Sequence, residues 1–490
     1  MNTGSFINGK WFHPKSDNYI RNTNPADPTD VIGEFPAATP QDVNKAIEAA
    51  AKAWPAWKNT PAPERGRILW RAADIVRQRI DEIARTMTRE EGKTVKESRG
   101  EVMKGLALLE YYSGDGFRMG GKTLPAEGRD VFTYTLRRPL GVVALITPFN
   151  FPWANPLWKT SPALVAGNTI VFKPSEITPA TASLIVEIYA EAGLPDGVLN
   201  MVVGYGNEIG DTLISAPEIK AVSFTGSNAV GSAIYTRIAE LGKKITCEMG
   251  GKNAVVVLKD ADLEKAAIAI TGGAFGSTGQ RCTATSRIIV EEKIKNDLLD
   301  ALISEAKKIK VGNGLEENVD MGPAVTDKQL KKDFEYIEIA KNEGAQLTFG
   351  GKKPQNMPTN GYFIEPTIFD KVTPHMRIFQ EEVFGPVLSI VSTRNIKEAI
   401  QFANAVQFGL STSFFSNDLS AVMEYIEEID VGMVHINEPS VGGEAQLPFG
   451  GTKATGVGDR EMADEGLNFF SETKTVFINY SGKAERSLMR

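Results

Sequence analysis

The sequence predicts an α/β protein with doubly wound, largely parallel sheets, and two observations support that fold class. From about residue 131 onward, short apolar runs rich in β-branched residues alternate with amphipathic stretches. The apolar runs are nearly continuous, as expected for parallel strands that helices cover on both faces. The alternation restarts after Gly251, which indicates a second α/β unit and a boundary near Gly250 and Gly251.

The N-terminal part is expected to be helical after a short strand region. Thr39-Pro40-Gln41-Asp42 has the pattern of a helix N-cap, a proline at the first helical position and an acidic first turn. The Ala-rich helix that begins there should run to about Trp57. Two further helices are expected over residues 63–91 and 95–114, the first of them ending at Gly92.

The alternating pattern then predicts each later element in order. Strands are expected at 132–137, 142–147, 169–173, 198–203, 221–225, 244–247 and 254–258, and in the second unit at 286–290 and 433–437. Helices are expected at 155–166, 179–192, 208–215 and 229–241, and in the second unit at 262–275, 292–308, 327–342, 396–404 and 419–428.

Composition argues against several classes of function. The 490 residues suggest two or three domains, and the net charge of −7 argues against a nucleic-acid-binding protein. No run approaches the ~20 apolar residues of a membrane span, and the first residues do not resemble a signal peptide. The two cysteines and three histidines lack metal-ligand spacing, so no metal is expected. So few cysteines also suit a reducing compartment, and we expect the cytoplasm.

Cys282 is a candidate nucleophile and Glu248 a candidate base. Cys282 stands in a polar turn after Gly279, and a thiolate both attacks carbonyl carbon and leaves readily from a thioester. Glu248 ends an apparent strand just before Gly250, where a carboxylate is well placed to activate water. A plainer interpretation of each residue is open: a buried structural cysteine and a surface glutamate at a strand end.

Two glycine-containing runs follow strands and begin helices, as phosphate-binding turns do. Phe224-Thr225-Gly226-Ser227 offers helix-start N–H groups and a hydroxyl, although its spacing is not GxGxxG. The run from Gly204 to Gly210, which includes Gly206, comes closer to the dinucleotide-binding fingerprint. Each run is also compatible with an ordinary turn.

Other polar and aromatic residues also lie just past strands or before chain breaks. Lys173 and Glu176 suit the hydroxyls of a ribose, or else pair with each other at the surface. The Asn150 amide suits a developing oxyanion, although asparagine beside proline is also a common turn residue. Glu382 and Phe384 suit the ribose and ring of a nicotinamide, or else are a solvated side chain and a core residue.

The most specific signal is the order and spacing of several runs. Along the chain they include Thr147-Pro148-Phe149-Asn150-Phe151-Pro152, Lys173-Pro174-Ser175-Glu176, Phe224-Thr225-Gly226-Ser227, Glu248-Met249-Gly250-Gly251-Lys252-Asn253, Gly279-Gln280-Arg281-Cys282, Glu381-Glu382-Val383-Phe384-Gly385-Pro386 and Pro448-Phe449-Gly450-Gly451. In this order they resemble the aldehyde dehydrogenase superfamily over essentially the whole chain.

That resemblance implies a three-part architecture. A Rossmann-like coenzyme domain is expected at residues 1–119 and 140–250, and an α/β catalytic domain at 251–454. A small β arm is expected at 120–139 and 472–490. The arm would present an edge strand to another subunit, giving a homodimer or a homotetramer.

The resemblance also implies a role for each matching residue. Cys282 is expected to be the nucleophile and Glu248 the general base, with Asn150 and the Cys282 backbone N–H forming an oxyanion hole. The expected coenzyme contacts are Thr147, Pro148, Phe149, Lys173, Ser175, Glu176, Gly206, Phe224, Gly226, Ser227, Gly250, Glu382 and Phe384. Many members have tryptophan where Phe149 stands. The coenzyme is NAD or NADP, with NAD favoured because Glu176 should repel a 2′-phosphate.

The implied reaction is oxidation of an aldehyde to a carboxylic acid through a cysteine thioester. Relatives that pass the acyl group to coenzyme A typically lack the glutamate, so Glu248 favours water as the acyl acceptor. A catalytically silent structural or binding relative is the alternative of another class, and the presence of both Cys282 and Glu248 argues against it.

Two stretches bear on the substrate. Residues 277–287 and 441–449 resemble 2-oxoglutarate semialdehyde (2,5-dioxopentanoate) dehydrogenases. That small-molecule aldehyde carries a carboxylate, so a cationic or amide donor should line its site, and Arg281 is a candidate. Succinate semialdehyde and other small aldehydes remain alternatives.

Overall fold

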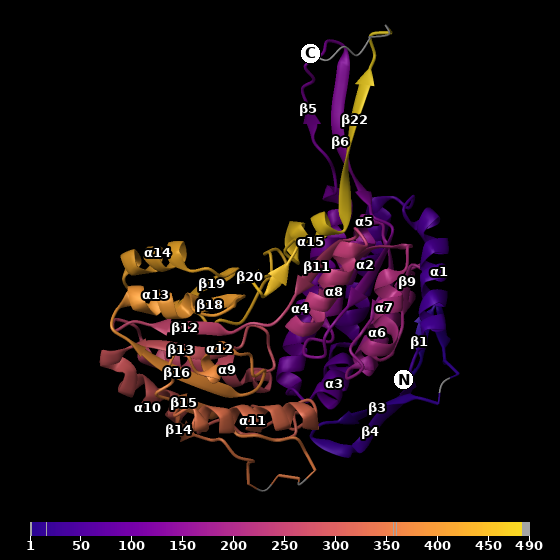
Figure 1. The fold of residues 1–490 in the computed structure, drawn as a ribbon. Helices are drawn as coiled ribbons and strands as arrows, with labels where there is room; N and C mark the ends of the chain where they lie inside the picture. Colours follow the sequence, from indigo (N-terminus) through magenta and orange to yellow (C-terminus); the bar gives the residue numbers. More distant parts are fainter. Residues whose placement is uncertain (1, 16, 356, 359, 483–490) are drawn as a thin grey trace.

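Two α/β units and a projecting β arm make up the protein (Figure 1). The computed structural model describes residues 2–15, 17–355, 357–358 and 360–482. Its main sheets contain eight and seven strands, and helices lie on both faces of each, so the predicted fold class is confirmed.

The first sheet has the strand order of a dinucleotide-binding fold. Its order is β2-β1-β9-β8-β7-β10-β11-β21. The bounds are β1 (Ser5–Ile7), β2 (Lys10–Phe12), β7 (Val142–Ile146), β8 (Thr169–Lys173), β9 (Leu199–Met201), β10 (Ile219–Thr225), β11 (Lys244–Glu248) and β21 (Gly456–Val457). The five strands from β9 to β11 are parallel, and counted from β7 they run 3-2-1-4-5. The strand order therefore reverses between β7 and β10, where ligands bind in such sheets.

Apolar side chains on the two faces of this sheet bury two separate cores. On one face Val143, Leu145 and Phe172 are buried in a cluster that includes residues of the N-terminal helices. On the other face Val142 and Val171 are buried in a second cluster. The helices of this unit are α1 (Pro40–Trp57), α2 (Ala62–Gln78), α3 (Ile80–Glu91), α4 (Val95–Arg118), α5 (Ala154–Ala166), α6 (Pro179–Glu191), α7 (Gly206–Ser215) and α8 (Asn228–Glu240).

The N-terminal helices confirm one prediction and correct two. Thr39 caps α1 with a full capping box, as its sequence predicts. The single helix expected over 63–91 is two helices, because Arg79 leaves the helical conformation at φ −115° and ψ 16°. The helix expected to end near residue 114 continues to Arg118. Gly116 lies inside this helix, and a Cβ at its position would come within 2.5 Å of the Ala62 carbonyl oxygen. The glycine therefore allows α2 and α4 to pack closely.

The second sheet has the order β14-β15-β16-β13-β12-β18-β19, parallel except for β14. Its strands are β12 (Asn253–Val257), β13 (Thr285–Glu291), β14 (Gln346–Phe349), β15 (Thr367–Asp370), β16 (Val387–Thr393), β18 (Ser411–Phe415) and β19 (Met433–Ile436). The helices are α9 (Leu263–Phe275), α10 (Lys295–Ala306), α11 (Asp327–Asn342), α12 (Arg377–Gln380), α13 (Ile396–Asn404) and α14 (Leu419–Glu428). The last helix, α15 (Ala463–Phe469), packs on α5 of the first unit. Two small pairs, β3 (Tyr19–Asn24) with β4 (Asp27–Pro36) and β17 (Phe408–Gly409) with β20 (Thr452–Lys453), complete the fold.

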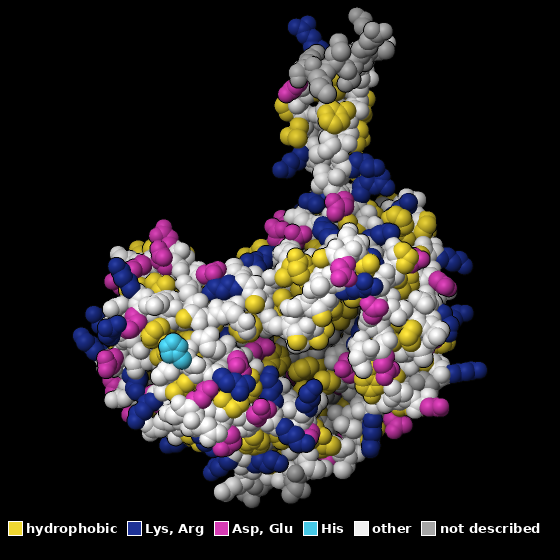
Figure 2. Space-filling model, in the orientation of Figure 1, with side chains coloured by type: hydrophobic (Ala, Val, Ile, Leu, Met, Phe, Trp, Pro, Cys, Tyr) yellow, Lys and Arg dark blue, Asp and Glu magenta, His cyan; other side chains and the backbone are white. Residues whose placement is uncertain are grey.

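The arm is a three-stranded antiparallel sheet of order β22-β6-β5 that projects from the body (Figure 1). Its strands are β5 (Thr123–Leu124), β6 (Val131–Pro139) and β22 (Ser471–Asn479). Because β22 has a partner on one side alone, it presents a sheet edge. Hydrophobic side chains gather on the arm in Figure 2, and the Phe477 side chain is 73% exposed. Of the arm that the sequence predicts, residues 483–490 lie outside the described residues.

The described part of the chain contains neither a membrane-spanning helix nor a cluster of metal-ligating side chains. None of its helices is both long enough and apolar enough to cross a bilayer. Nor do its Cys, His, Asp and Glu side chains form a group of three or more that could hold a metal ion.

Candidate active site

A turn of left-handed residues positions Cys282. Ser277, Thr278 and Gly279 have φ values of 49°, 58° and 69°. This conformation is uncommon for serine and strained for the β-branched threonine, so the surrounding structure must hold the turn. Only glycine fits at position 279, because a Cβ there would lie 2.3 Å from the Gly385 carbonyl oxygen.

The backbone of Cys282 is tied to the start of β12. Asn253 Nδ2 donates to the Cys282 carbonyl oxygen at 2.7 Å and to the Ala284 carbonyl oxygen at 2.9 Å. Asn253 follows Glu248 by five residues, so the nucleophile and the candidate base are joined through one short segment.

Two cavities meet at Cys282. One of about 360 Å³ lies between α4, the turn before Cys282 and the loop at 441–443. The other, of about 210 Å³, lies at the carboxyl ends of β7 and β10. The side chains that line both are Phe151, Trp158, Cys282 and Phe449. The thiol is therefore reachable from both sides, as a nucleophile between a substrate and a coenzyme must be.

Burial keeps Cys282 protonated. Together with the negative charges of Glu382 and Glu248, it raises the pKa of the thiol to about 12. A thiol with this pKa is almost entirely neutral at pH 7. A base must therefore take its proton before or during attack.

Glu248 is a buried carboxyl group at the end of β11, 3% exposed. Burial raises its pKa well above the ordinary glutamate value, and nearby Glu461 raises it further. Its Oε2 atom has no hydrogen-bond partner among the described residues. A carboxylate with a raised pKa and a free oxygen is suited to accept a proton from the thiol or from water.

A buried network lies behind Glu248. The Lys159 ammonium group contacts the Glu461 carboxylate, and it donates to Ser223 Oγ at 2.8 Å. Trp158 Nε1 donates to the other oxygen of Glu461 at 2.7 Å. Each oxygen of this buried carboxylate therefore has a partner, as a buried charge requires.

The Asn150 side chain is turned toward the nucleophile. Its Nδ2 donates to the Gln280 carbonyl oxygen at 3.0 Å, two residues before Cys282. An amide nitrogen carries two hydrogens, so one remains available to an oxyanion beside Cys282. The Asn150 carbonyl oxygen accepts a bond from Lys93 Nζ at 2.6 Å.

Two glutamates of α4 hold the segments that carry Asn150 and Cys282. Glu101 accepts from the backbone N–H groups of Trp153 and Ala154 at 2.9 and 3.0 Å, and from Lys93 Nζ at 2.7 Å. Glu97 accepts from the backbone N–H of Ser277 at 2.6 Å. Burial alone lowers the pKa of Lys93, but Glu101 and Glu91 more than offset it, so the net pKa lies above the ordinary lysine value.

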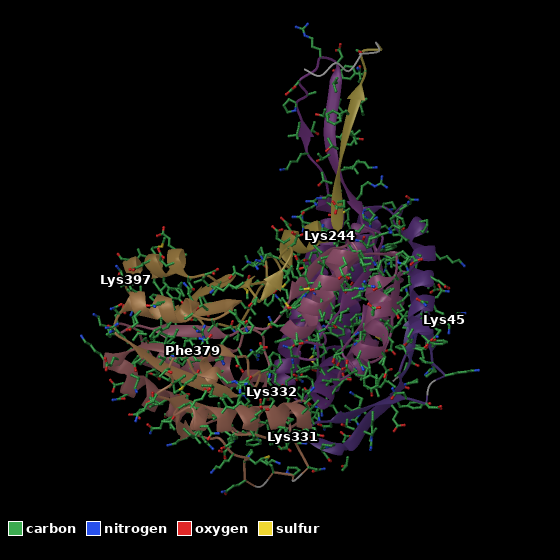
Figure 3. The ribbon with its side chains drawn as sticks, viewed as in Figure 1. Lys45, Lys244, Lys331, Lys332, Phe379 and Lys397 are labelled. Carbon is green, nitrogen blue, oxygen red and sulfur yellow. The ribbon has the colours of Figure 1, made fainter. Side chains whose placement is uncertain are left out.

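The smaller cavity contains seven of the predicted coenzyme residues. They are Pro148, Phe149, Gly226, Ser227, Gly250, Glu382 and Phe384. Glu382 Oε1 accepts from the Gly251 N–H at 2.9 Å, and a Cβ on Gly250 would lie 2.6 Å from its other oxygen. The Phe149 and Phe384 rings meet edge to face with centroids 5.9 Å apart. Lys332 of α11 donates to the Glu382 carbonyl oxygen at 3.1 Å, where the two units face each other (Figure 3).

The remaining predicted coenzyme residues lie outside that cavity. Lys173 Nζ is 3.5 Å from Glu176 Oε2, and Gly206 at the start of α7 lies beside the Lys173 side chain. Thr147 N donates to the Lys173 carbonyl oxygen at 3.2 Å, and Ser175 Oγ accepts from the Ile177 N–H. The Phe224 ring is buried beneath Gly226, in a small apolar cluster with Cys247 and Met249.

A carboxylate and aromatic edges at the switch point of a parallel sheet fit a nicotinamide riboside. The outer group at β8 and α7 fits a second ribose. The sequence matches the family described as "Aldehyde dehydrogenase family" over residues 11–476. The chain belongs to the aldehyde dehydrogenase family. It is an enzyme that oxidises aldehydes with a nicotinamide coenzyme.

Individual relatives resemble this aldehyde dehydrogenase over nearly its full length. It is 46% identical to the alpha-ketoglutaric semialdehyde dehydrogenase of Bacillus subtilis, over 97% of each chain. It is 45% identical to the 2,5-dioxopentanoate dehydrogenase of Saccharolobus solfataricus, over 96% of this chain and 98% of that one. Among solved structures, Staphylococcus aureus betaine aldehyde dehydrogenase in complex with NAD+ matches with a TM-score of 0.96 and 34% identity, over 100% and 97% of the chains.

Sequence reasoning missed several residues around this site. Lys93, Glu97 and Glu101 lie far from the nucleophile in the sequence. Lys93 stands in Glu91-Gly92-Lys93-Thr94, a run that also resembles the family, but nothing local distinguishes Glu97 and Glu101 from other charged residues of a helix. Phe449 belongs to the run Pro448-Phe449-Gly450-Gly451, so the sequence could have identified it. Arg281, the predicted partner of a substrate carboxylate, is already engaged: its guanidinium lies 3.3 Å from Glu97 and donates to Ser277 Oγ.

Glu101 should control how fast the thioester forms. In Glu101→Gln we expect the pre-steady-state burst of NADH to slow about 10-fold or more, as when an oxyanion donor is displaced. Thermal stability should also fall, because buried Lys93 loses its nearer carboxylate and keeps only Glu91, at 3.9 Å, as an ion-pair partner. The double variant Lys93→Met/Glu101→Gln removes the Lys93 charge, so it should regain thermal stability while its burst remains slow.

The matched control for this prediction is Glu110→Gln on the same helix, where Glu110 pairs with Arg77 away from the nucleophile. It should show the wild-type burst. Recovery of the burst together with the melting temperature in the double variant would contradict a positioning role for Glu101.

Proposed function

We propose that this aldehyde dehydrogenase oxidises 2-oxoglutarate semialdehyde to 2-oxoglutarate, with water as the acyl acceptor. The observation that carries the proposal is the 46% and 45% identity to two relatives that are named for this aldehyde, over nearly the whole chain. The cavity beside Cys282 supports it, because the three cations that line its wall, Lys93, Lys104 and Arg281, outnumber its two carboxylates, Glu97 and Glu101. Succinate semialdehyde or another small aldehyde is the alternative.

In the proposed mechanism, Cys282 and Asn150 carry out the first step. Once deprotonated, the Cys282 sulfur forms a bond to the aldehyde carbon, and the aldehyde oxygen becomes an oxyanion. The second amide hydrogen of Asn150 and the backbone N–H of Cys282 stabilise that charge. When bound, the nicotinamide coenzyme supplies the two-electron oxidation that turns the hemithioacetal into a thioester.

Glu248 is proposed to act in the second step. Its carboxylate takes a proton from water while the water oxygen adds to the thioester carbonyl. The C–S bond then breaks, the carboxylic acid leaves, and the thiolate of Cys282 is regenerated. The raised pKa of Glu248 suits this role, because a more basic carboxylate removes a proton from water more readily.

We propose that NAD is the preferred coenzyme. Glu176 lies beside Lys173 at the end of β8, where its carboxylate would accept bonds from ribose hydroxyls and repel a 2′-phosphate. NADP is the alternative: the Lys173 ammonium donates to the Pro174 carbonyl oxygen at 3.0 Å and lies 3.5 Å from Glu176, which leaves one of its three donors for a 2′-phosphate. The free thiols of Cys247 and Cys282 suit a reducing compartment, and the cytoplasm is the proposed location.

The division of the chain into coenzyme, catalytic and oligomerisation parts, with the boundaries expected above, remains a proposal. Pairing of β22 with another subunit, to form a homodimer or a homotetramer, is part of it. Support comes from the free edge of β22 and from the exposed side chains of Phe132, Phe477 and Ile478.

A substrate panel tests the proposed function. Wild-type protein with NAD or NADP is given 2-oxoglutarate semialdehyde, succinate semialdehyde and butanal, and kcat/KM is measured at 340 nm without coenzyme A. The largest kcat/KM should belong to 2-oxoglutarate semialdehyde with NAD, and turnover should continue without coenzyme A. A higher value for either other aldehyde contradicts the proposed substrate, and a single turnover that stops without coenzyme A contradicts water as the acceptor.

Glu248→Gln should separate the two chemical steps. We expect a burst of about one NADH per subunit followed by steady-state turnover at least about 100-fold slower, because the water has lost its general base. Cys282→Ser should show neither phase, and exposed Glu427→Gln should match the wild type in rapid-quench measurements. Equal loss of the burst and the steady state in Glu248→Gln would contradict a role confined to hydrolysis.

Phe477→Glu should weaken subunit association through the arm. A charge at this largely exposed apolar position of β22 would be buried on pairing, so we expect a smaller mass by light scattering. Lys474→Glu on the same strand is the control: it replaces one charged side chain by another, so the mass of the assembly should stay unchanged. Equal masses for wild type and Phe477→Glu would contradict association through this face of the arm.

A further inference from the structure

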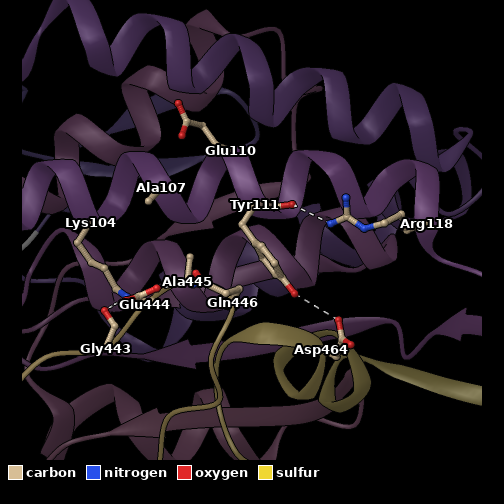
Figure 4. Close-up of a pocket in the computed structure, with 10 residues that line it drawn as sticks. All are labelled: Lys104, Ala107, Glu110, Tyr111, Arg118, Gly443, Glu444, Ala445, Gln446 and Asp464. Atoms are coloured by element: carbon tan, nitrogen blue, oxygen red, sulfur yellow. Dashed lines mark hydrogen bonds between the residues drawn. The ribbon is translucent and has the colours of Figure 1, made fainter.

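Lys104 stands at the outer end of the substrate cavity. It lines the cavity of about 360 Å³ that reaches Cys282. It also lines a second, open cavity of about 840 Å³ on the surface, together with Glu110, Tyr111 and Asp464 (Figure 4). Gly443 is shared by the two cavities in the same way. Lys104 therefore lies where surface and interior cavities meet.

Three cationic side chains line the substrate cavity, and two of them already have carboxylate partners. Lys93 pairs with Glu101 at 2.7 Å and Arg281 with Glu97 at 3.3 Å. Lys104 takes part in none of the ion pairs between described residues, and its Nζ donates to the carbonyl oxygen of Gly443 (Figure 4). An ammonium group has three donors, so Lys104 retains donors for a ligand.

The loop opposite Lys104 offers further donors. Gly442 and Gly443 line the same cavity, and among the hydrogen bonds of the described residues none uses their backbone N–H groups. The space around Gly442 is open, with no atom within 4 Å of where its Cβ would be. Unpaired N–H groups beside an ammonium group form a site that suits an anion.

The electrostatic environment keeps Lys104 cationic near neutral pH. Burial lowers its pKa and the negative charge of Glu444 partly opposes that shift, which leaves the pKa at about 8. At pH 7 the protonated form still dominates by about tenfold. A partly desolvated ammonium attracts a carboxylate more strongly than a fully hydrated one does.

We propose that Lys104 binds the carboxylate at the far end of the substrate from the aldehyde, with the N–H groups of Gly442 and Gly443 as additional donors. The proposal rests on the proposed function, because it requires a substrate with such a carboxylate. It makes Lys104 a specificity residue that selects charged semialdehydes and leaves the chemistry to Cys282 and Glu248.

Lys104→Met tests the proposal while keeping the length and apolar stem of the side chain. With saturating NAD, kcat/KM is measured for 2-oxoglutarate semialdehyde, succinate semialdehyde and butanal, which has no carboxylate. We expect a loss of about 10- to 100-fold for the two charged aldehydes, as for one charge-assisted hydrogen bond, and a change within about twofold for butanal. Lys104→Arg, which keeps the charge, should recover part of the loss.

Lys96→Met is the matched control, because Lys96 is exposed on the same helix and lines neither cavity. It should leave all three aldehydes unaffected. Equal losses for all three aldehydes in Lys104→Met, or an unchanged ratio of charged to neutral aldehyde, would overturn the role of Lys104.

The same measurements distinguish this inference from the proposed function. If the wild type prefers 2-oxoglutarate semialdehyde and Lys104→Met keeps the wild-type ratio of charged to neutral aldehyde, the proposed substrate stands and the role of Lys104 fails. If the wild type prefers succinate semialdehyde and Lys104→Met loses both charged aldehydes, the role of Lys104 stands and the proposed substrate fails. A wild type that does not distinguish charged from neutral aldehydes overturns both.

Discussion

Glu97 and Glu101 lie about one turn apart on α4 and hold two segments that come from different α/β units. Glu101 accepts from the backbone after Asn150, and Glu97 from the turn before Cys282. Bonds from backbone N–H groups to buried carboxylates are strong and directional. Because both anchors belong to one helix, the separation between Asn150 and Cys282 depends on a rigid element and not on two loops.

A second constraint is the burial of groups whose charge must change during the reaction. The pKa values of Cys282 and Glu248 both lie above their ordinary ranges, so each resists ionisation in the protein without its ligands. Protons can then move between thiol, carboxyl and water without a fixed negative charge accumulating at the nucleophile. The Lys159–Glu461 pair behind Glu248 supplies charges of both signs, and these act on Glu248 in opposite directions: Glu461 raises its pKa and Lys159 lowers it.

The parts of this fold that depend on local pattern could be predicted from the sequence. Helix α11 has the predicted bounds, and so does strand β8, because its apolar run and its limits lie within a few residues. The end of α4 shows where local reasoning fails: the helix expected to end near Gly114 continues to Arg118 through Gly116, where Ala62 approaches from another helix. No glycine or proline marks the bend at Arg79 in the sequence. Neither the close approach at Gly116 nor the conformation of Arg79 is contained in a local sequence pattern.

The candidate site divides in the same way. Cys282 and Glu248 stand in runs whose glycines indicate that backbone segments approach closely there. Their sequence neighbours therefore identify them as candidate site residues. Charged residues of a helix have no such neighbours, and their partners decide what they do. Arg281 adjoins the nucleophile in the sequence, but its pairing with Glu97 makes it part of the turn that positions Cys282. Lys104 lies 178 residues before Cys282 in the sequence and has no carboxylate partner among the described residues. The cation that is free to bind a ligand is therefore not the one that stands beside the nucleophile in the sequence.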